Sequence, residues 1–230
     1  MNAFKYLFSC FLLGITIPGN TFTQIAGDVY VNEDAQLAET ADVDFEIISI
    51  LRHETDSVFS QLTTTSYIFN QEENAYVRTS IKQKGIVFST DAENAYNLVL
   101  KLREDLFTLG HLIFISEADK AHNIYAIAII RSSDQFDILR MMQTNGENYN
   151  IFNKDVISKL NEWYTKYPFI IIGAGSDWVE AMFDQSPANT ENFANEVYEF
   201  CPDVVDSGSG SVKYLADEMK DTGILYLWWQ

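Results

Sequence analysis

Two pairs of apolar segments, each joined by a short polar turn, constrain the fold more than any other feature of the sequence. Residues 111–116 and 124–130 flank a polar turn, and residues 169–172 and 177–183 flank a turn containing glycine. Such short connections predict antiparallel hairpins, because a parallel crossover needs a dozen or more residues. We therefore expect a sheet that is at least partly antiparallel.

Helix-forming patterns lie between and around these hairpins. Thr90 and Glu93 form a capping box ahead of apolar residues at helical spacing, and similar spacing recurs later in the chain. Because helices and hairpins are mixed rather than strictly alternating, the pattern favours an α+β fold with a mixed, largely antiparallel sheet over a doubly wound nucleotide-binding fold. We expect helices at 90–110, 134–142, 153–167 and 190–201, a last helix capped by Ser209 or Ser211 and ending at Met219, and further strands at 45–51, 85–89 and 224–229.

The N-terminal sequence is typical of a secretory signal. Lys5 precedes an apolar run and Pro18, and this run is too short to span a bilayer, so no transmembrane span is expected in the mature chain. Cleavage of residues 1–23 would export the protein to the periplasm or the medium; without it the protein would be cytoplasmic. A first strand buried in the core is the competing interpretation, and lipidation at Cys10 is a third.

The remaining chain divides into an arm and a domain. Residues 24–44 are polar, acidic and without periodicity, which predicts a linker or a loosely held arm. Residues 45–230 are expected to form a single α+β domain, since 47% of the chain is hydrophobic and a segment of this length can bury a substantial core.

The charge of the chain limits its partners. It has 33 acidic and 15 basic residues, a formal net charge of −18. Such a chain repels phosphates and anionic membrane surfaces, so we expect no nucleic-acid partner. Acidic residues concentrate at 28–46 and 177–206, two stretches without Lys or Arg. These stretches either keep the protein soluble or attract a basic partner protein by electrostatic steering.

The C-terminal sequence resembles a known family. Residues 196–206 are Glu196-Val-Tyr-Glu-Phe-Cys-Pro-Asp-Val-Val-Asp206, two glycines follow, and residues 225–229 are Leu225-Tyr-Leu-Trp-Trp229. This string resembles the bacterial family called domain of unknown function 4253, and the similarity extends over residues 124–230. Ser207 departs from the usual Gln, and Gln230 from the usual Asp. The resemblance supports the domain assignment and implies no activity.

A candidate binding surface lies in the same region. Two aspartates precede a Ser/Gly loop, but a calcium or magnesium site needs more oxygen ligands, so neither a metal nor a cofactor is expected. The structural alternative is that the aspartates accept hydrogen bonds from turn amides. Regular pleating would put the last two tryptophans on opposite faces, and an exposed tryptophan beside acids is a common protein-binding anchor. The candidate residues are Trp178, Glu180, Cys201, Pro202, Asp203, Asp206, Gly208, Gly210, Trp228 and Trp229.

Two functional hypotheses follow. The first is a non-catalytic binding or regulatory module, for example an immunity-type protein that blocks a basic effector through an acidic face. The second is an exported hydrolase whose site is assembled by the fold near Cys201, Asp203 and Asp206. The sequence contains no recognised nucleophile motif, so it assigns no catalytic residue, and the first hypothesis is favoured.

Overall fold

A computed structural model describes residues 32–70 and 74–230 of the chain. Residues Asp34–Gln230 form one compact unit, and the description below concerns that unit. The predicted signal segment 1–23, with Cys10, lies outside the described residues.

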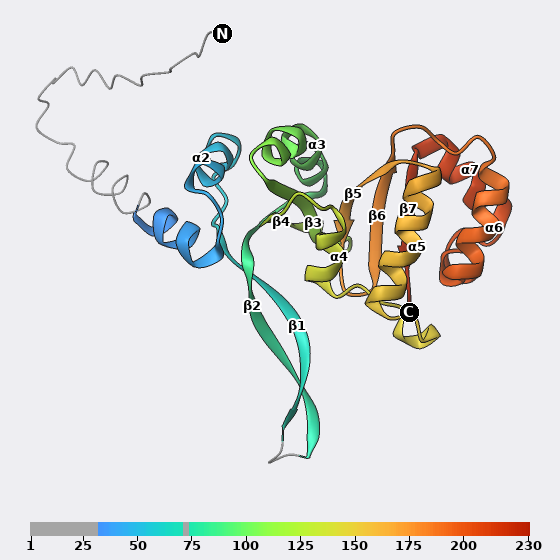
Figure 1. The fold of residues 1–230 in the computed structure, drawn as a ribbon, viewed down its shortest axis with the longest axis horizontal. Coiled ribbons are helices and arrows are strands. Elements are labelled where there is room, and N and C mark those ends of the chain that lie inside the picture. Colours follow the sequence, from blue (N-terminus) through green and yellow to red (C-terminus); the bar gives the residue numbers. More distant parts are fainter. Residues whose placement is uncertain (1–31, 71–73) are drawn as a thin grey trace, which may run out of the picture. The chain divides into compact units, whose positions relative to one another are not determined.

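The described residues contain a seven-stranded mixed sheet with the strand order β1-β2-β4-β3-β5-β6-β7 (Figure 1). All neighbouring strands are antiparallel except β3 and β5, which are parallel and pair only at Ile115 and Gly173. The α+β prediction and both predicted hairpins are therefore confirmed. The strands are β1 (Ser60–Asn70), β2 (Ala75–Thr90), β3 (His111–Asp119), β4 (Ile124–Arg131), β5 (Phe169–Ala174), β6 (Trp178–Phe183) and β7 (Ile224–Trp228).

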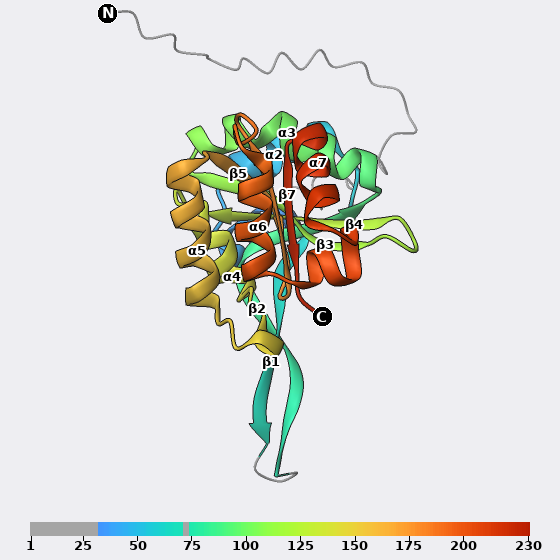
Figure 2. The same ribbon diagram turned by 90° about the vertical axis from the view of Figure 1, so that its right-hand side faces the viewer.

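Two hydrophobic cores lie on opposite faces of the sheet, because the central strands β3 and β4 are buried on both sides. On one face, α2 (Phe45–Glu54) and α3 (Ala92–Thr108) pack against residues such as Ile113 and Ile127. The other face is covered by α4 (Phe136–Met142), α5 (Asn153–Lys166) and α6 (Thr190–Phe200), with Trp163 and Phe193 fully buried. Helix α7 (Val212–Thr222) packs beside α6 and β7, as Figure 2 shows.

The region before β1 differs from the prediction. Residues 45–51 belong to helix α2 rather than to a strand, since Ile47, Ile48 and Leu51 share one buried helical face. Of the expected linker 24–44, residues 32–41 are helical, and Ala38 and Ala41 there are buried. Arg52 holds this helix through Asp34, with Nη2 and Oδ1 2.7 Å apart. The compact unit thus begins before residue 45.

The helix starts lie within a residue or two of the prediction. The N-cap of α3 is Asp91 rather than Thr90, and the carboxylate of Asp91 accepts from the backbone N–H of Asn94. Ser211 caps α7 as expected, through the backbone N–H of Tyr214. These hydroxyl and carboxylate caps satisfy backbone donors that the first helical turn leaves unpaired.

Candidate functional site

The first half of the C-terminal motif, residues 201–205, is mostly buried, whereas most of residues 206–210 are exposed. Cys201 is 0% exposed and its thiol donates to the carbonyl of Trp228, with Sγ and O 3.0 Å apart. Asp203 is 7% exposed and accepts two hydrogen bonds, from the Tyr149 hydroxyl at 2.6 Å and from the backbone N–H of Gln230 at 2.8 Å. Hydrogen bonds of Cys201 and Asp203 therefore connect the end of β7 to the turn that follows α6.

This geometry does not support Cys201 as a nucleophile. Burial raises the pKa of the Cys201 thiol to about 12, so the sulfur stays protonated at neutral pH, whereas the thiolate is the reactive form. The Nδ1 atom of His111 lies 2.9 Å from Leu109 O, and Nδ1 of His122 lies 2.7 Å from a carboxylate oxygen of Asp119. Neither histidine contacts the sulfur.

The other candidate residues of the motif divide between buried and exposed positions. Pro202 begins a turn that continues as a π-helical segment, η2 (Val204–Ser209), and Gly210 ends it in the left-handed region at φ 77°. Asp206 is exposed and accepts from the Tyr198 hydroxyl at 3.1 Å. Because Asp203 is enclosed and Asp206 is not, the two aspartates do not form a common outward face. Asp206 is thus accessible to a partner and Asp203 is enclosed, and a binding role for this part of the motif stays a prediction.

The two C-terminal tryptophans point to opposite faces, as regular pleating predicts. Trp229 is 4% exposed and packs in the core against Phe200, with ring centroids 5.9 Å apart. Its ring also leaves no room for a side chain at Gly146. Trp228 is partly buried on the other face, beside Gly208 of η2. Only Trp228 is therefore available to a ligand.

Trp228 and Glu180 both line a pocket of about 490 Å³, called here the Glu180 pocket. Its floor is the part of the sheet formed by β6 and β7, where Glu180 pairs with Tyr226. Both side chains project from the same face, because directly paired residues of antiparallel strands do so. The full lining is Tyr96, Lys120, Glu180, Val204, Gly208, Ser209, Leu215, Glu218, Met219, Thr222, Ile224, Tyr226 and Trp228.

The carboxylate of Glu180 is held in place and partly removed from water. The hydroxyl of Tyr96, on α3, donates to its Oε2 at 2.7 Å. Burial raises the pKa of the Glu180 carboxyl above its ordinary value, and this effect exceeds the opposing hydrogen bond from Tyr96 and the attraction of Lys120. Burial and the nearby Glu180 and Asp177 raise the pKa of Tyr226 to about 12. The tyrosines therefore stay neutral while the carboxyl can ionise.

A cation already lies at the mouth of this pocket. The Nζ atom of Lys120, in the turn between β3 and β4, lies 4.8 Å from the centroid of the Tyr226 ring. A positive group over an aromatic face is attracted by the ring quadrupole, and a neighbouring carboxylate adds to that attraction. The pocket thus has the chemistry of a site for an ammonium or guanidinium group.

The structure brings Glu180, Gly208 and Trp228 together, as three of the candidates around one pocket. Trp178 lies next to them, its ring centroid 6.1 Å from that of Tyr226, but it is not part of the lining. Tyr226 was not identified from the sequence, although the alternation of β7 places it on the same face as Trp228. Tyr96 and Lys120 come from distant segments that carry no motif.

Neither a metal-binding cluster nor a membrane-spanning helix is found among the described residues. No group of three or more His, Cys, Asp or Glu side chains within residues 32–70 and 74–230 has the geometry to hold a metal ion. In the same part of the chain, no helix is both long enough and apolar enough to cross a membrane.

Comparison with known proteins bears out the resemblance in the sequence. Residues 126–230, the C-terminal half of the chain, match the family model described as "Domain of unknown function (DUF4253)". This region begins in β4 and includes β6, β7 and the C-terminal motif. The search of curated proteins gave no match, and the search of solved structures gave none.

Proposed function

We propose that this chain, whose residues 126–230 match the model of a domain family of unknown function, is a non-catalytic binding module for a basic partner protein. A lysine or arginine side chain of the partner would enter the Glu180 pocket. The observation that carries the proposal is a half-buried carboxylate, Glu180, next to the aromatic rings of Tyr226 and Trp228. Removal from water strengthens both its charge attraction and any cation–π contact.

The net charge of the chain also favours a basic partner. A net charge of −18 attracts positively charged proteins over a distance and accelerates their encounter. Close to the site, Glu218 lines the pocket and Asp177 lies near enough to raise the pKa of Tyr226. If the basic partner is an effector, this chain would block it as immunity proteins do, which is one special case of the proposal.

Lys120 supports the proposal because its own ammonium group already makes a cation–π contact with Tyr226. Its ammonium group occupies the face of Tyr226 and remains exposed, so it is held weakly. An incoming cation would compete with Lys120 for the ring and for Glu180. Exchange of one cation for another preserves the charge balance of the pocket.

The experiment is titration of the full chain with a tetralysine peptide at low salt, followed by calorimetry and by the fluorescence of the tryptophans. Trp178 and Trp228 lie next to or in the pocket, so binding there changes their emission. Glu180→Gln keeps the shape of the side chain and its hydrogen bond to Tyr96 but removes the charge. We expect it to weaken binding about tenfold.

The matched control is Glu46→Gln, which neutralises an exposed glutamate in the first turn of α2. It changes the net charge by the same amount outside the Glu180 pocket, and we expect it to change the affinity less than about twofold. Equal weakening by the two variants would mean that the peptide responds only to overall charge, and the proposal would fail. A tetraglutamate peptide should not bind.

A further inference from the structure

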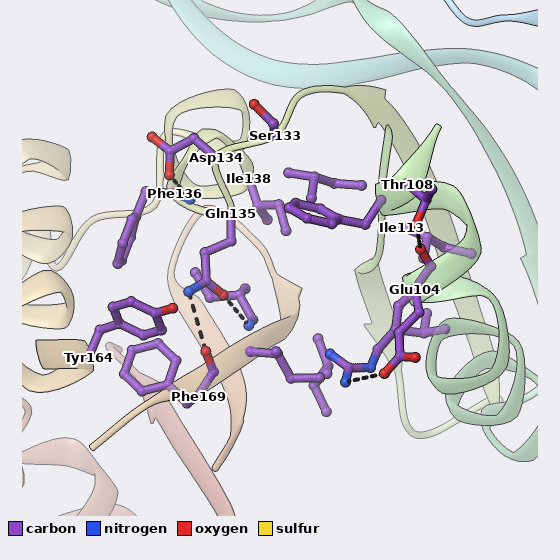
Figure 3. Close-up of a pocket in the computed structure, with 17 residues that line it drawn as sticks. Glu104, Thr108, Ile113, Ser133, Asp134, Gln135, Phe136, Ile138, Tyr164 and Phe169 are labelled. Carbon is purple, nitrogen blue, oxygen red and sulfur yellow. Dashed lines mark hydrogen bonds and ion pairs between the residues drawn. The ribbon is translucent and has the colours of Figure 1, made fainter. Parts of the chain in front are cut away.

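The sheet is open between β3 and β5. These parallel neighbours pair only at Ile115, in the middle of β3, and at Gly173, near the end of β5. Before that pair the strands separate, and a cleft of about 550 Å³ lies between Leu112 and Ile113 of β3 and residues 169–172 of β5. Figure 3 shows Ile113 and Phe169 on opposite sides of it.

The side chain of Gln135 replaces the missing strand at the edge of β5. Its Oε1 accepts from the backbone N–H of Ile171 at 2.9 Å, and its Nε2 donates to the carbonyl of Phe169 at 3.3 Å. These two bonds resemble those that one residue of a neighbouring strand would make. Gln135 therefore stabilises the opening, because it pairs backbone groups of β5 that would otherwise lack a partner strand.

The walls of the cleft are mainly apolar and aromatic. On one side lie Phe136, Tyr164 and Phe169, whose rings meet edge to face, with Phe136 and Tyr164 centroids 6.1 Å apart and Tyr164 and Phe169 centroids 5.5 Å apart. Phe107 of α3 contributes to the opposite side and is 52% exposed. The volume lies in the range of small-molecule sites, which combine apolar walls with a few polar groups.

The charges at the cleft compensate one another. Arg103 pairs with Glu104, with Nη2 and Oε1 3.2 Å apart, and Asp134 pairs with Arg140, with Oδ2 and Nη1 2.7 Å apart. No excess positive charge remains in the lining to attract an anion, and the negative charge of the whole chain opposes one. The apolar walls would not compensate a cation for its lost hydration.

Gln135 also provides a polar contact inside the cleft. A primary amide has two N–H donors and two acceptor lone pairs, and β5 uses one of each. One N–H donor and one acceptor lone pair of the amide therefore remain available without release of the strand. A single neutral hydrogen-bonding group of a ligand can bond to either of them.

We propose that the cleft between β3 and β5 binds an uncharged, largely aromatic or aliphatic small molecule that carries one neutral hydrogen-bonding group. The apolar body of the ligand contacts Phe107, Phe136 and Tyr164, and its polar group bonds to Gln135. This site is separate from the Glu180 pocket, since the two linings share no residue.

The test uses a pair of fluorescent probes with the same ring skeleton. N-phenyl-1-naphthylamine is uncharged and has one N–H, and 8-anilino-1-naphthalenesulfonate adds a negative sulfonate. We expect the neutral probe to bind the full chain once, and the sulfonate to bind at least about tenfold more weakly because no unpaired cation receives it. Glu180→Gln should leave binding of the neutral probe unchanged.

Two exposed phenylalanines provide the matched variants. Phe107→Ala removes part of the cleft wall and should weaken the neutral probe about fivefold to tenfold, whereas Phe107→Leu should restore most of the affinity. Phe152 is 57% exposed and does not line the cleft, so Phe152→Ala should have no effect. Equal loss in both alanine variants, more than one bound probe per chain, or equal affinity for the two probes would overturn the proposal. Melting curves confirm that each variant is folded.

Discussion

At the scale of single residues, Glu180 affects both the proposed binding of a cation and the stability of the fold. Its pKa is raised by burial, so the folded protein favours the protonated form of this carboxyl more than the unfolded chain does. The folded state therefore loses stability as the pH rises through the ordinary value of 4.5 and towards the folded pKa. A buried acid that costs stability when ionised is typical of binding and catalytic sites.

Replacement of this carboxyl should consequently stabilise the protein at neutral pH. Glu180→Gln removes the cost of burying a charge and keeps an acceptor for Tyr96. We expect a higher urea midpoint than that of the unmodified chain at pH 7 and a smaller difference at pH 4, where the carboxyl of the folded protein is protonated. A difference that does not depend on pH would show that Glu180 is neutral at pH 7 or gains a compensating partner there.

At the scale of elements, the two aspartates of the C-terminal motif have unequal parts in holding β7. Asp203→Ala removes acceptors for the Tyr149 hydroxyl and the Gln230 backbone, and we expect it to lower the free energy of unfolding by about 2–4 kcal/mol. Asp206→Ala removes only one exposed hydrogen bond, to Tyr198, and should cost less than about 1 kcal/mol. Denaturant unfolding measures both. Similar costs would contradict the network described for the motif.

The elements that could be predicted are those whose signals are local. The hairpins follow from short turns between apolar runs, and the shared face of Trp178 and Glu180 follows from the alternation of residues along β6. Helix α2 was missed because its short apolar segment, residues 45–51, fits either period. Lys120 and Tyr96 reach the pocket only through pairings between distant segments, which leave no pattern in the sequence.

The enclosure of Asp203 was unpredictable for a similar reason. Sequence distinguishes an acid in a turn from one in a helix, but its burial depends on which chain segments cover it. Here Tyr149, at the end of the short 3-10 helix Glu147–Tyr149, and Gln230, two residues after β7, both contact it. Cleft formation between β3 and β5 depends likewise on Gln135, whose two backbone contacts lie more than thirty residues away in sequence.

At the scale of the whole molecule, the family model covers residues 126–230, whereas the compact folded unit covers residues 34–230. Residues 126–230 include β4 but not β2 and β3, which pair with β4 on its two sides. They also exclude α2 and α3, which cover the face of β4 that carries Ile127 and Ile129. A fragment with these limits would expose both edges and one apolar face of a central strand.

We therefore expect residues 126–230 alone to remain unfolded or to aggregate, because unpaired strand edges and uncovered apolar faces favour association over folding. A chain of residues 34–230 keeps the whole sheet and should unfold cooperatively, with a midpoint close to that of the full chain. Circular dichroism during heating and size-exclusion chromatography compare the two. A cooperative melt of the shorter fragment would show that the C-terminal half is an independent domain, and that β2, β3 and α3 are additions to it rather than parts of its core.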